Sequence, residues 1–430
     1  MKILHTSDWH LGQSFMGKSR EPEHRAFLEW LLQLIEYESV NAVIVAGDIF
    51  DTTTPPSYAR SLYNEFIVQM HQAGCQLVIL GGNHDSVSML HESASLAQCL
   101  GTHVVGGVLQ SPAEQVITLK NANTQVGAIV CAIPFIRARD VVESQAGQTG
   151  QEKQQALIKA MADHFDAVYR EALDTRTQLQ RNVPIIATGH LTTLASSKSE
   201  SVRDIYVGTL ESFPADHLPK ADYIALGHIH KPMSVAGQAH VRYSGSPIHL
   251  SFDEVNHDKQ VQLVSFNGEL ESTVESVTVP RFRQMRTVNG SLAEVTRELE
   301  SLPASISETA LDIWLEISIH TDDYLSGLHQ QLENLIEGKP MEILRLRRKR
   351  SAKDAVLNTE RKKSLKEFLP KDVFLQRLAE EPLEPEQKAK LLETFTKLVT
   401  EVEANVALDD SELHRARGAA APKINSPEGA

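Results

Sequence analysis

Five short turns carry the side chains whose types and spacing could support catalysis, and each turn follows an apolar run. Oxygen and imidazole ligands without a thiolate suit Mn²⁺, Fe²⁺ or Zn²⁺. If the five runs are strands, their ends could gather these side chains into one metal centre. The turns are Asp8-Trp9-His10, Gly47-Asp48, Gly82-Asn83-His84-Asp85, Gly189-His190 and Gly227-His228-Ile229-His230.

Seven candidate ligands in these turns are too many for one ion of ordinary coordination number. They suit two ions that share a carboxylate. Two metal ions about 3.5–4 Å apart favour hydrolysis of a phosphate ester, because they activate water and neutralise the phosphate oxygens. A neighbouring imidazole can then protonate the leaving oxygen. Other histidines, such as His24, His71 and His164, occupy polar or helical surroundings and are expected to be structural.

The elements that would position these turns form a layered α/β pattern. Residues 42–47 are continuously apolar, which is typical of a strand covered on both faces. Pro22 suits the start of a helix, and we expect Ser57 to cap a second helix that ends near Gln72. The strands expected before the turns are 2–7, 42–47, 76–81, 182–190 and 222–227, with a long helix at 151–173.

The sequence changes character after Pro280, so we divide the chain into five parts. Residues 1–280 carry all five turns, whereas 281–350 repeat strands and helices without a ligand cluster. Residues 351–363 are polar and charged, as in a linker. Residues 364–405 have apolar positions at helical spacing and predict a helix-loop-helix segment. Residues 406–430 are polar and rich in Ala, Gly and Pro, which predicts a disordered tail.

Composition limits the function classes. The chain has 430 residues, 41% of them hydrophobic, and therefore can bury a full core in each of two or three domains. Three widely spaced cysteines suit a reducing compartment, and no stretch approaches a membrane helix. We therefore expect a cytoplasmic protein with no membrane partner. The net charge of −14 argues against nucleic acid, although bound metal ions can reverse the sign locally.

A competing motif lies at residues 12–19, Gly-Gln-Ser-Phe-Met-Gly-Lys-Ser, which matches the phosphate-binding loop of nucleotide hydrolases. The helix of such a loop would begin near Lys18 and would contain Pro22, which interrupts helices. The motif also leaves the histidines of the last two turns without a role, so we expect no nucleotide site here.

Two basic groups have open interpretations. The run at 345–350 is either a solvated strand edge or a contact with DNA or a partner. Lys18, Arg20 and Arg25 are either ordinary surface residues or groups that position phosphate.

The five turns together resemble the signature of the calcineurin-like metallophosphoesterases. The resemblance implies a four-layer fold, a β-sandwich flanked by helices, followed by a small α+β capping domain at 281–350 and a C-terminal helical pair. It implies one ion held by Asp8, His10, Asp48 and His230, and a second held by Asp48, Asn83, His190 and His228, with Asp48 as the bridge. It makes His84 the catalytic imidazole and Asp85 its hydrogen-bonding partner.

A narrower resemblance involves the stretches 3–12, 55–60 and 203–210 and is to the nuclease subunits of bacterial SbcC–SbcD DNA-repair complexes. It implies a nuclease with two Mn²⁺, or Mg²⁺ or another divalent ion, that cuts duplex ends as an exonuclease and hairpins and single strands as an endonuclease.

The implied partners are DNA, a coiled-coil ATPase of the SbcC type that binds residues 364–405, and a second nuclease subunit within a heterotetramer near the nucleoid. Related nucleases often carry a second active-site histidine where this chain has Asp51, so Asp51 is a candidate catalytic residue that would orient His84. The alternatives are a phosphoesterase for a small molecule or protein, and a scaffold without activity.

Overall fold

The computed structural model describes residues 1–142, 149–193, 212–268, 270–302, 311–320 and 327–349, together with 388, 390–392 and 394–395. The segments predicted as linker, helical pair and tail lie almost entirely outside the described residues, as does the stretch 203–210. The few described residues of 388–395 are helical. Residues 1–350 and 351–430 form two separate units.

The first sheet of the larger unit has six strands in the order β14-β13-β1-β4-β5-β6. Strands β1, β4, β5 and β6 are parallel to one another, whereas β13 and β14 are antiparallel additions at one edge. The strands predicted before the first three turns are confirmed within one or two residues. Their bounds are β1 (Lys2–Thr6), β4 (Ala42–Val45), β5 (Gln76–Leu80), β6 (Thr102–Val105), β13 (Gln260–Ser265) and β14 (Thr273–Thr278).

The second sheet also has six strands, in the order β11-β12-β10-β9-β8-β7. Its central strands β8, β9, β10 and β12 are parallel, and β7 and β11 pair antiparallel at the two edges. The last two predicted turns follow the two central strands β9 and β10. The bounds are β7 (Val116–Lys120), β8 (Val126–Cys131), β9 (Ile185–His190), β10 (Tyr223–Gly227), β11 (Met233–Val235) and β12 (Gln238–Tyr243).

Side chains of successive residues in these strands enter different cores, which explains why the strands are apolar throughout. In β4, Val43 and Val45 pack beneath helices, whereas Ile44 packs between the two sheets. In β8, Ile129 faces the helical side and Val130 faces the first sheet. A strand with both faces covered needs apolar side chains at every position.

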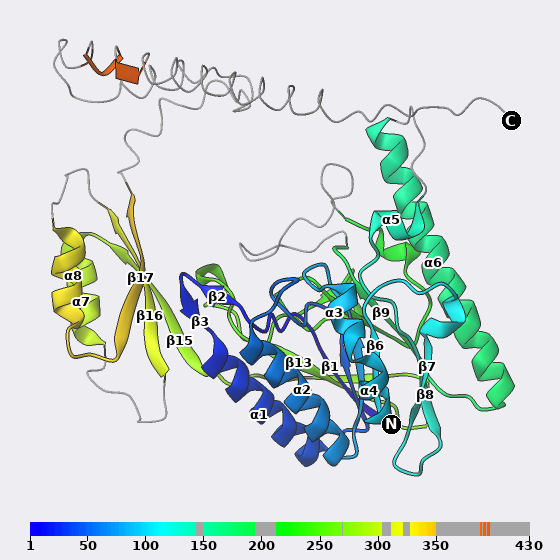
Figure 1. The fold of residues 1–430 in the computed structure, drawn as a ribbon. Helices are drawn as coiled ribbons and strands as arrows, with labels where there is room; N and C mark the ends of the chain where they lie inside the picture. The colour runs from blue at the N-terminus through cyan, green and yellow to red at the C-terminus, as the bar shows by residue number, and fades with distance from the viewer. Residues whose placement is uncertain are drawn as a thin grey trace, which may run out of the picture. The chain divides into compact units, whose positions relative to one another are not determined.

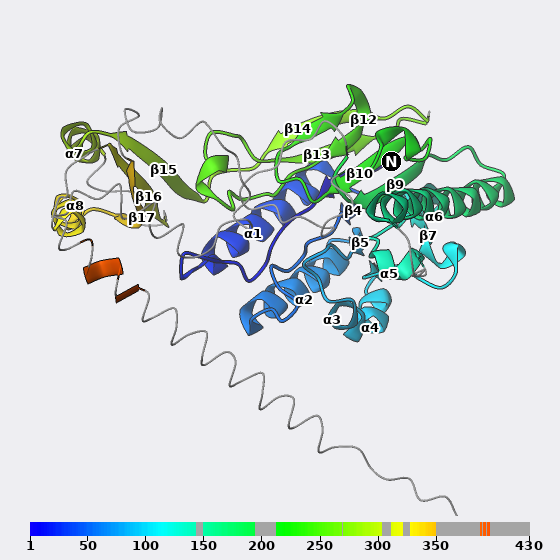
Figure 2. The same cartoon turned by 90° about the horizontal axis from the view of Figure 1, so that it is seen from above.

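Helices cover the outer face of each sheet and complete four layers, α/β/β/α, which confirms the predicted fold class (Figures 1 and 2). Helices α1 and α2 pack on the first sheet, and the long helix α6 packs on the second. Ser57 is the first residue of α2 and Pro56 is its N-cap, so the prediction that Ser57 caps this helix was wrong. The bounds are α1 (Glu21–Glu38), α2 (Ser57–Gln72), α3 (Val87–Glu92), α4 (Ala94–Cys99), α5 (Ala138–Val141) and α6 (Gly150–Leu179).

The motif that matches a phosphate-binding loop forms a small hairpin. Strands β2 (Ser14–Phe15) and β3 (Lys18–Ser19) pair antiparallel, and α1 begins only at Glu21. Lys18 forms an ion pair with Glu342 at 2.5 Å. The chain therefore lacks the loop-to-helix geometry that cradles phosphates, as expected from Pro22.

Residues after Pro280 form a three-stranded parallel sheet with two helices. Strands β15 (Arg283–Gly290), β16 (Leu311–His320) and β17 (Met341–Lys349) lie in this order, and α7 (Leu292–Ser301) and α8 (Leu328–Ile336) pack on the sheet. Ile313, Leu315 and Ile317 of β16 point toward these helices, as their alternation predicts. Within the basic run at 345–350, Arg345 and Arg347 lie 2.9 and 3.3 Å from the carboxylate of Glu316.

Trp314 of β16 packs against the hairpin that follows the first metal turn. Its ring stacks on Phe15, with the ring centroids 5.8 Å apart. The guanidinium groups of Arg20 and Arg283 lie over the same ring at 5.2 and 4.1 Å. Glu23 binds both guanidinium groups, at 2.8 and 3.1 Å. This aromatic and ionic cluster fixes β16 against the hairpin.

Candidate metal centre

The carboxyl ends of the central parallel strands carry the predicted turns and bring them to one edge of the sandwich. In the first sheet the turns follow β1, β4 and β5, which are hydrogen-bonded neighbours. In the second sheet they follow β9 and β10, which are also neighbours. Direct bonds join the turns, because the main-chain N–H of Asp8 donates to Gly47 and that of His228 donates to the carboxylate of Asp8.

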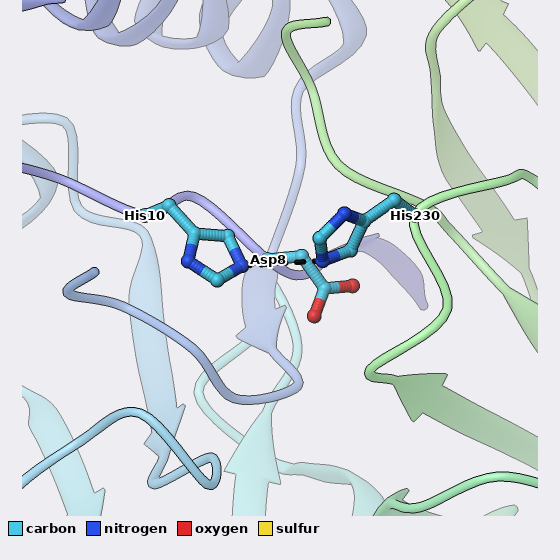
Figure 3. A group of neighbouring side chains, drawn as sticks. All are labelled: Asp8, His10 and His230. Carbon is cyan, nitrogen blue, oxygen red and sulfur yellow. Dashed lines mark hydrogen bonds between the residues drawn. The ribbon is translucent and has the colours of Figure 1, made fainter. Parts of the chain in front are cut away.

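One cluster at this edge contains Asp8, His10 and His230, whose potential ligand atoms all lie within 4.8 Å of one another. All three residues are buried. The Nε2 atoms of His10 and His230 are 3.3 Å apart, and Figure 3 shows the two rings facing each other beside the carboxylate of Asp8. Two imidazole nitrogens and a carboxylate converging in this way suit a divalent ion.

A second cluster contains Asp48, His190 and His228, again with all potential ligand atoms within 4.8 Å. The amide oxygen of Asn83 lies 2.9 Å from Nε2 of His190 and 3.2 Å from Nδ1 of His228. Oδ2 of Asp48 is 3.2 Å from Nε2 of His190 and 3.6 Å from Nε2 of His10. The Asp48 carboxylate therefore lies between the two clusters, where a bridging ligand would have to be.

The histidine rings are held from behind by acceptors for Nδ1. His10 is bound by Asp51 at 3.2 Å, His190 by the carbonyl of Ala46 at 2.9 Å, and His230 by a glutamate described below. An acceptor at Nδ1 fixes the proton there and turns Nε2 toward the cluster, as is usual for metal-bound histidine. His228 has the opposite orientation, with Nδ1 facing Asn83.

Carboxylates give the pocket an electrostatic preference for positive charge. Burial disfavours the charged form of His190, but Asp48 and then Asp8 outweigh burial and raise its pKa to about 9. Burial also acts against the charged form of His10, yet Asp51, Asp48 and Asp8 raise its pKa above the ordinary value. Buried groups that favour a cation in this way, with oxygen and imidazole donors, fit divalent metal ions.

His84 lies beside both clusters and is oriented by the main chain of Asp51. Its ring is perpendicular to that of His10, with the centroids 4.7 Å apart, and its potential ligand atom lies within 4.8 Å of those of His10 and Asp48. Nδ1 of His84 donates to the carbonyl oxygen of Asp51 at 2.7 Å. Asp51 thus contacts two histidines, one through its carboxylate and one through its main chain.

Asp85 does not have the contact that the family resemblance implied. Its carboxylate accepts hydrogen bonds from the main-chain N–H groups of Ile49, Phe50 and Gly82, at 3.1, 2.9 and 2.8 Å. These bonds join the second and third turns. We therefore assign Asp85 to the support of the turns, and the orientation of the His84 ring to Asp51.

The turns are also unusual in their backbone conformation. Asp8, His10, Asp48 and His228 all have positive φ, between 48° and 93°, where residues other than glycine are rare. Such conformations cost of order 1–3 kcal/mol each and concentrate at functional sites. Gly47 has φ of 93°, and a Cβ atom there would collide with the His190 ring.

Two parts of the site were not anticipated from the sequence. Glu254, which binds His230, lies in a polar stretch that carries no motif. Arg20 is only 1% exposed and binds Glu23 and the carbonyl of His249, so it is neither of the two things considered for it, a surface residue or a phosphate-positioning group. His24 is likewise fully buried, and burial lowers its pKa to about 3.

No helix among the described residues has the length and apolar character needed to cross a membrane.

Comparison with known proteins agrees with this architecture. Residues 1–232 match the family described as calcineurin-like phosphoesterase, and residues 281–381 match one described as Type 5 capsule protein repressor C-terminal domain. The SbcD subunit of nuclease SbcCD from Escherichia coli (strain K12) is 49% identical over 92% of this chain and 97% of its own length. The protein of the same name from Rhodobacter capsulatus is 31% identical, over 80% of this chain and 86% of its own length.

A solved dimetal phosphatase from Danio rerio covers 65% of this chain and 99% of its own length, with a TM-score of 0.34 and 9% identity, and a likeness so distant carries no argument. The family match over more than half of the chain and the identity of 49% show that this chain belongs to the calcineurin-like phosphoesterases and, among them, to the SbcD family of nuclease subunits.

Proposed function

We propose that this chain is the nuclease subunit of an SbcCD-type complex and hydrolyses DNA phosphodiester bonds with two Mn²⁺ ions. The observation that carries the proposal is the Asp48 carboxylate, which lies 3.2 Å from His190 in one cluster and 3.6 Å from His10 in the other. A single ion would not need a carboxylate between two complete ligand sets. The relatives that match nearly the whole chain are named as nucleases, which supports DNA as the substrate.

The proposed ligands of one ion are Asp8, His10, Asp48 and His230, and those of the other are Asp48, Asn83, His190 and His228. When bound, two such ions supply activation of water and neutralisation of the phosphate charge. Oxygen and imidazole donors accept Mn²⁺, and also Mg²⁺ or other divalent ions, so the donor set agrees with Mn²⁺ without demanding it.

His84 is the proposed proton donor to the leaving oxygen. Its Nδ1 proton is committed to the Asp51 carbonyl at 2.7 Å, so exchange of a proton with the substrate falls to Nε2. The main-chain N–H of His84 donates to Oδ1 of Asp48 at 2.9 Å, which ties the position of this ring to the carboxylate between the clusters. An imidazole so placed can contribute roughly 10²–10⁴-fold to the rate.

The finer activities and partners are part of the same proposal. We infer double-strand exonuclease activity and hairpin and single-strand endonuclease activity, acting in DNA repair and recombination. The partners are DNA, a coiled-coil ATPase of the SbcC type and a second copy of the nuclease subunit within a heterotetramer. The location is the cytoplasm, at the nucleoid. The name SbcCD of the relatives supports an ATPase partner, since it denotes a complex of two different proteins.

The test is cleavage of end-labelled duplex and hairpin DNA by the purified chain with Mn²⁺, beside p-nitrophenyl phosphate esters under the same conditions. We expect cleavage of DNA that EDTA abolishes and that Mn²⁺ restores. Asp48→Asn, which preserves shape but removes the bridging charge, should be inactive. Hydrolysis of the phosphate esters without any cleavage of DNA would instead favour a phosphoesterase for a small molecule or protein.

A further inference from the structure

Glu254 connects the metal centre to a buried charge pair that none of the metal-binding turns contains. It ends the 3-10 turn Phe252–Glu254 and is 3% exposed. Its Oε1 atom lies 3.3 Å from Nδ1 of His230. Its other oxygen, Oε2, accepts from the main-chain N–H of Leu250 at 2.9 Å and from the ammonium group of Lys259 at 2.7 Å. One carboxylate thus holds a proposed metal ligand with one oxygen and its own loop with the other.

Lys259 holds the same histidine by a second route. Its side chain is buried, and Nζ donates to the main-chain carbonyl of His230 at 3.0 Å and to Ser246 Oγ at 2.7 Å, besides Glu254. These three bonds use the three protons of an ammonium group. Lys259 therefore restrains the backbone of His230 and also the carboxylate that binds its ring.

The chemistry of the contact determines which nitrogen of His230 can bind a metal. An ionised carboxylate only accepts hydrogen bonds, so Nδ1 of His230 must carry the proton. Nε2 then keeps its lone pair and faces Nε2 of His10 at 3.3 Å. Burial acts against ionisation of Glu254, but Lys259 and His230 together hold its pKa well below the ordinary value, so it is ionised at neutral pH.

We propose that Glu254 and Lys259 form a positioning pair that fixes the tautomer and direction of His230 and so sets the affinity of the Asp8–His10–His230 cluster for its ion. The inference rests on the proposed two-metal site. Groups that hold metal-bound histidines in this way typically change metal affinity by 10–100-fold when they are removed.

Stability alone does not account for the pair. A buried ion pair contributes little net stability, because desolvation of the charges offsets their attraction. The chain offers a matched comparison in Glu23, which is 1% exposed and bound to Arg20 and Arg283. Glu23 has the same charge and similar burial, but its ion pairs go to the hairpin and to β15 rather than to a proposed metal ligand.

The experiment compares Glu254→Gln with Glu23→Gln in the full chain by titration of Mn²⁺ into the metal-free protein, followed by calorimetry and by electron paramagnetic resonance. We expect Glu254→Gln to weaken one of the two sites by roughly 10–100-fold and to leave the other nearly unchanged. Glu23→Gln should lower the melting temperature and leave both sites as in the wild type. Glu254→Asp should recover part of the lost affinity, because it keeps the charge.

Equal affinities of Glu254→Gln and the wild type, or equal losses in both variants, would overturn the proposal. If the wild type itself binds fewer than two ions, the proposed two-metal site fails, and this result is distinct from an unaffected variant. A second measurement does not depend on variant folding. Nitrogen-15 NMR of the wild type loaded with diamagnetic Zn²⁺ should show His230 protonated at Nδ1 and bound through Nε2, and the opposite tautomer would refute the role of Glu254.

Discussion

The main-chain carbonyl oxygen of Asp51 accepts a 2.7 Å hydrogen bond from Nδ1 of His84. Because this contact uses the backbone, a substitution of the Asp51 side chain should leave the His84 ring oriented. The carboxylate of Asp51 lies instead 3.2 Å from Nδ1 of His10. Asp51→Ala should therefore weaken metal binding at the His10 cluster more than it impairs the proton donor, which a Mn²⁺ titration beside rates at saturating Mn²⁺ would separate.

His84→Ala should retain both ions and lose roughly 10²–10⁴-fold in the rate of DNA cleavage, because the proton donor to the leaving oxygen is removed. Metal content by mass spectrometry and cleavage rates on the same preparation would check this. His329→Ala is a suitable control, since His329 is 60% exposed on α8. A drop in metal content as large as the drop in rate would mean that His84 is a ligand.

Metal analysis should find two ions in each chain after loading with Mn²⁺, and Asp48→Ala should reduce binding at both positions. The reason is the location of this carboxylate within 3.2 and 3.6 Å of one histidine in each cluster. Two Mn²⁺ ions that share a ligand should also give an exchange-coupled paramagnetic resonance spectrum. Asp258→Asn, at a 69% exposed carboxylate, is the control. One ion in the wild type would contradict the prediction.

Trp314→Ala should lower the free energy of unfolding by about 3–5 kcal/mol, the usual effect of removing a large buried aromatic side chain. The ring is 3% exposed and lies between Phe15 and two arginines, so its loss leaves a cavity and two buried cations without their ring contact. Urea denaturation would measure the change. Trp314→Phe should lose much less, and a similar loss in both variants would show that ring stacking is not the stabilising contact.

DNA binding by the isolated chain should be weak and should fall steeply with salt. The net charge is −14, and in the basic run Arg345 and Arg347 are partly neutralised by Glu316. Phosphate contacts lose affinity with salt because counterions are released on binding. Fluorescence anisotropy with labelled duplex DNA between low and physiological salt would test this. Tight binding that is independent of salt would disagree with it.

A truncated chain that ends near Lys353 should keep Mn²⁺-dependent nuclease activity and lose co-purification with an SbcC-type ATPase. All the proposed ligands precede residue 231, whereas the amphipathic pattern that predicts a partner lies at 364–405. The truncation removes the second unit of the chain and keeps the first nearly intact. Full affinity of the truncated chain for the ATPase would show that the partner binds elsewhere.

The sequence predicted the strands and their turns well because both depend on local patterns. The apolar run at 42–47 identified a strand with two covered faces, and β4 has Val43 and Ile44 in different cores. Pro22 correctly excluded a phosphate-binding loop, since α1 begins at Glu21. These signals lie within a few residues of the feature that they predict.

The supporting contacts of the site could not be predicted, because they join residues far apart in the chain. The contact of Glu254 with His230 joins two loops, and no pattern near Glu254 distinguishes it from other polar segments. The burial of Arg20 depends on Trp314, which lies almost three hundred residues later. The roles of Asp51 and Asp85 were exchanged because the bond to His84 comes from a main-chain carbonyl, which every residue has.

The left-handed backbone of Asp8, His10, Asp48 and His228 has a consequence for directed evolution. A library selected for thermal stability alone should enrich glycine or asparagine at these positions, because those residues adopt positive φ with less strain. The same substitutions would remove proposed metal ligands. Selection for stability and selection for activity would therefore pull these four positions in opposite directions, and an inactive variant that melts at a higher temperature should be easy to obtain.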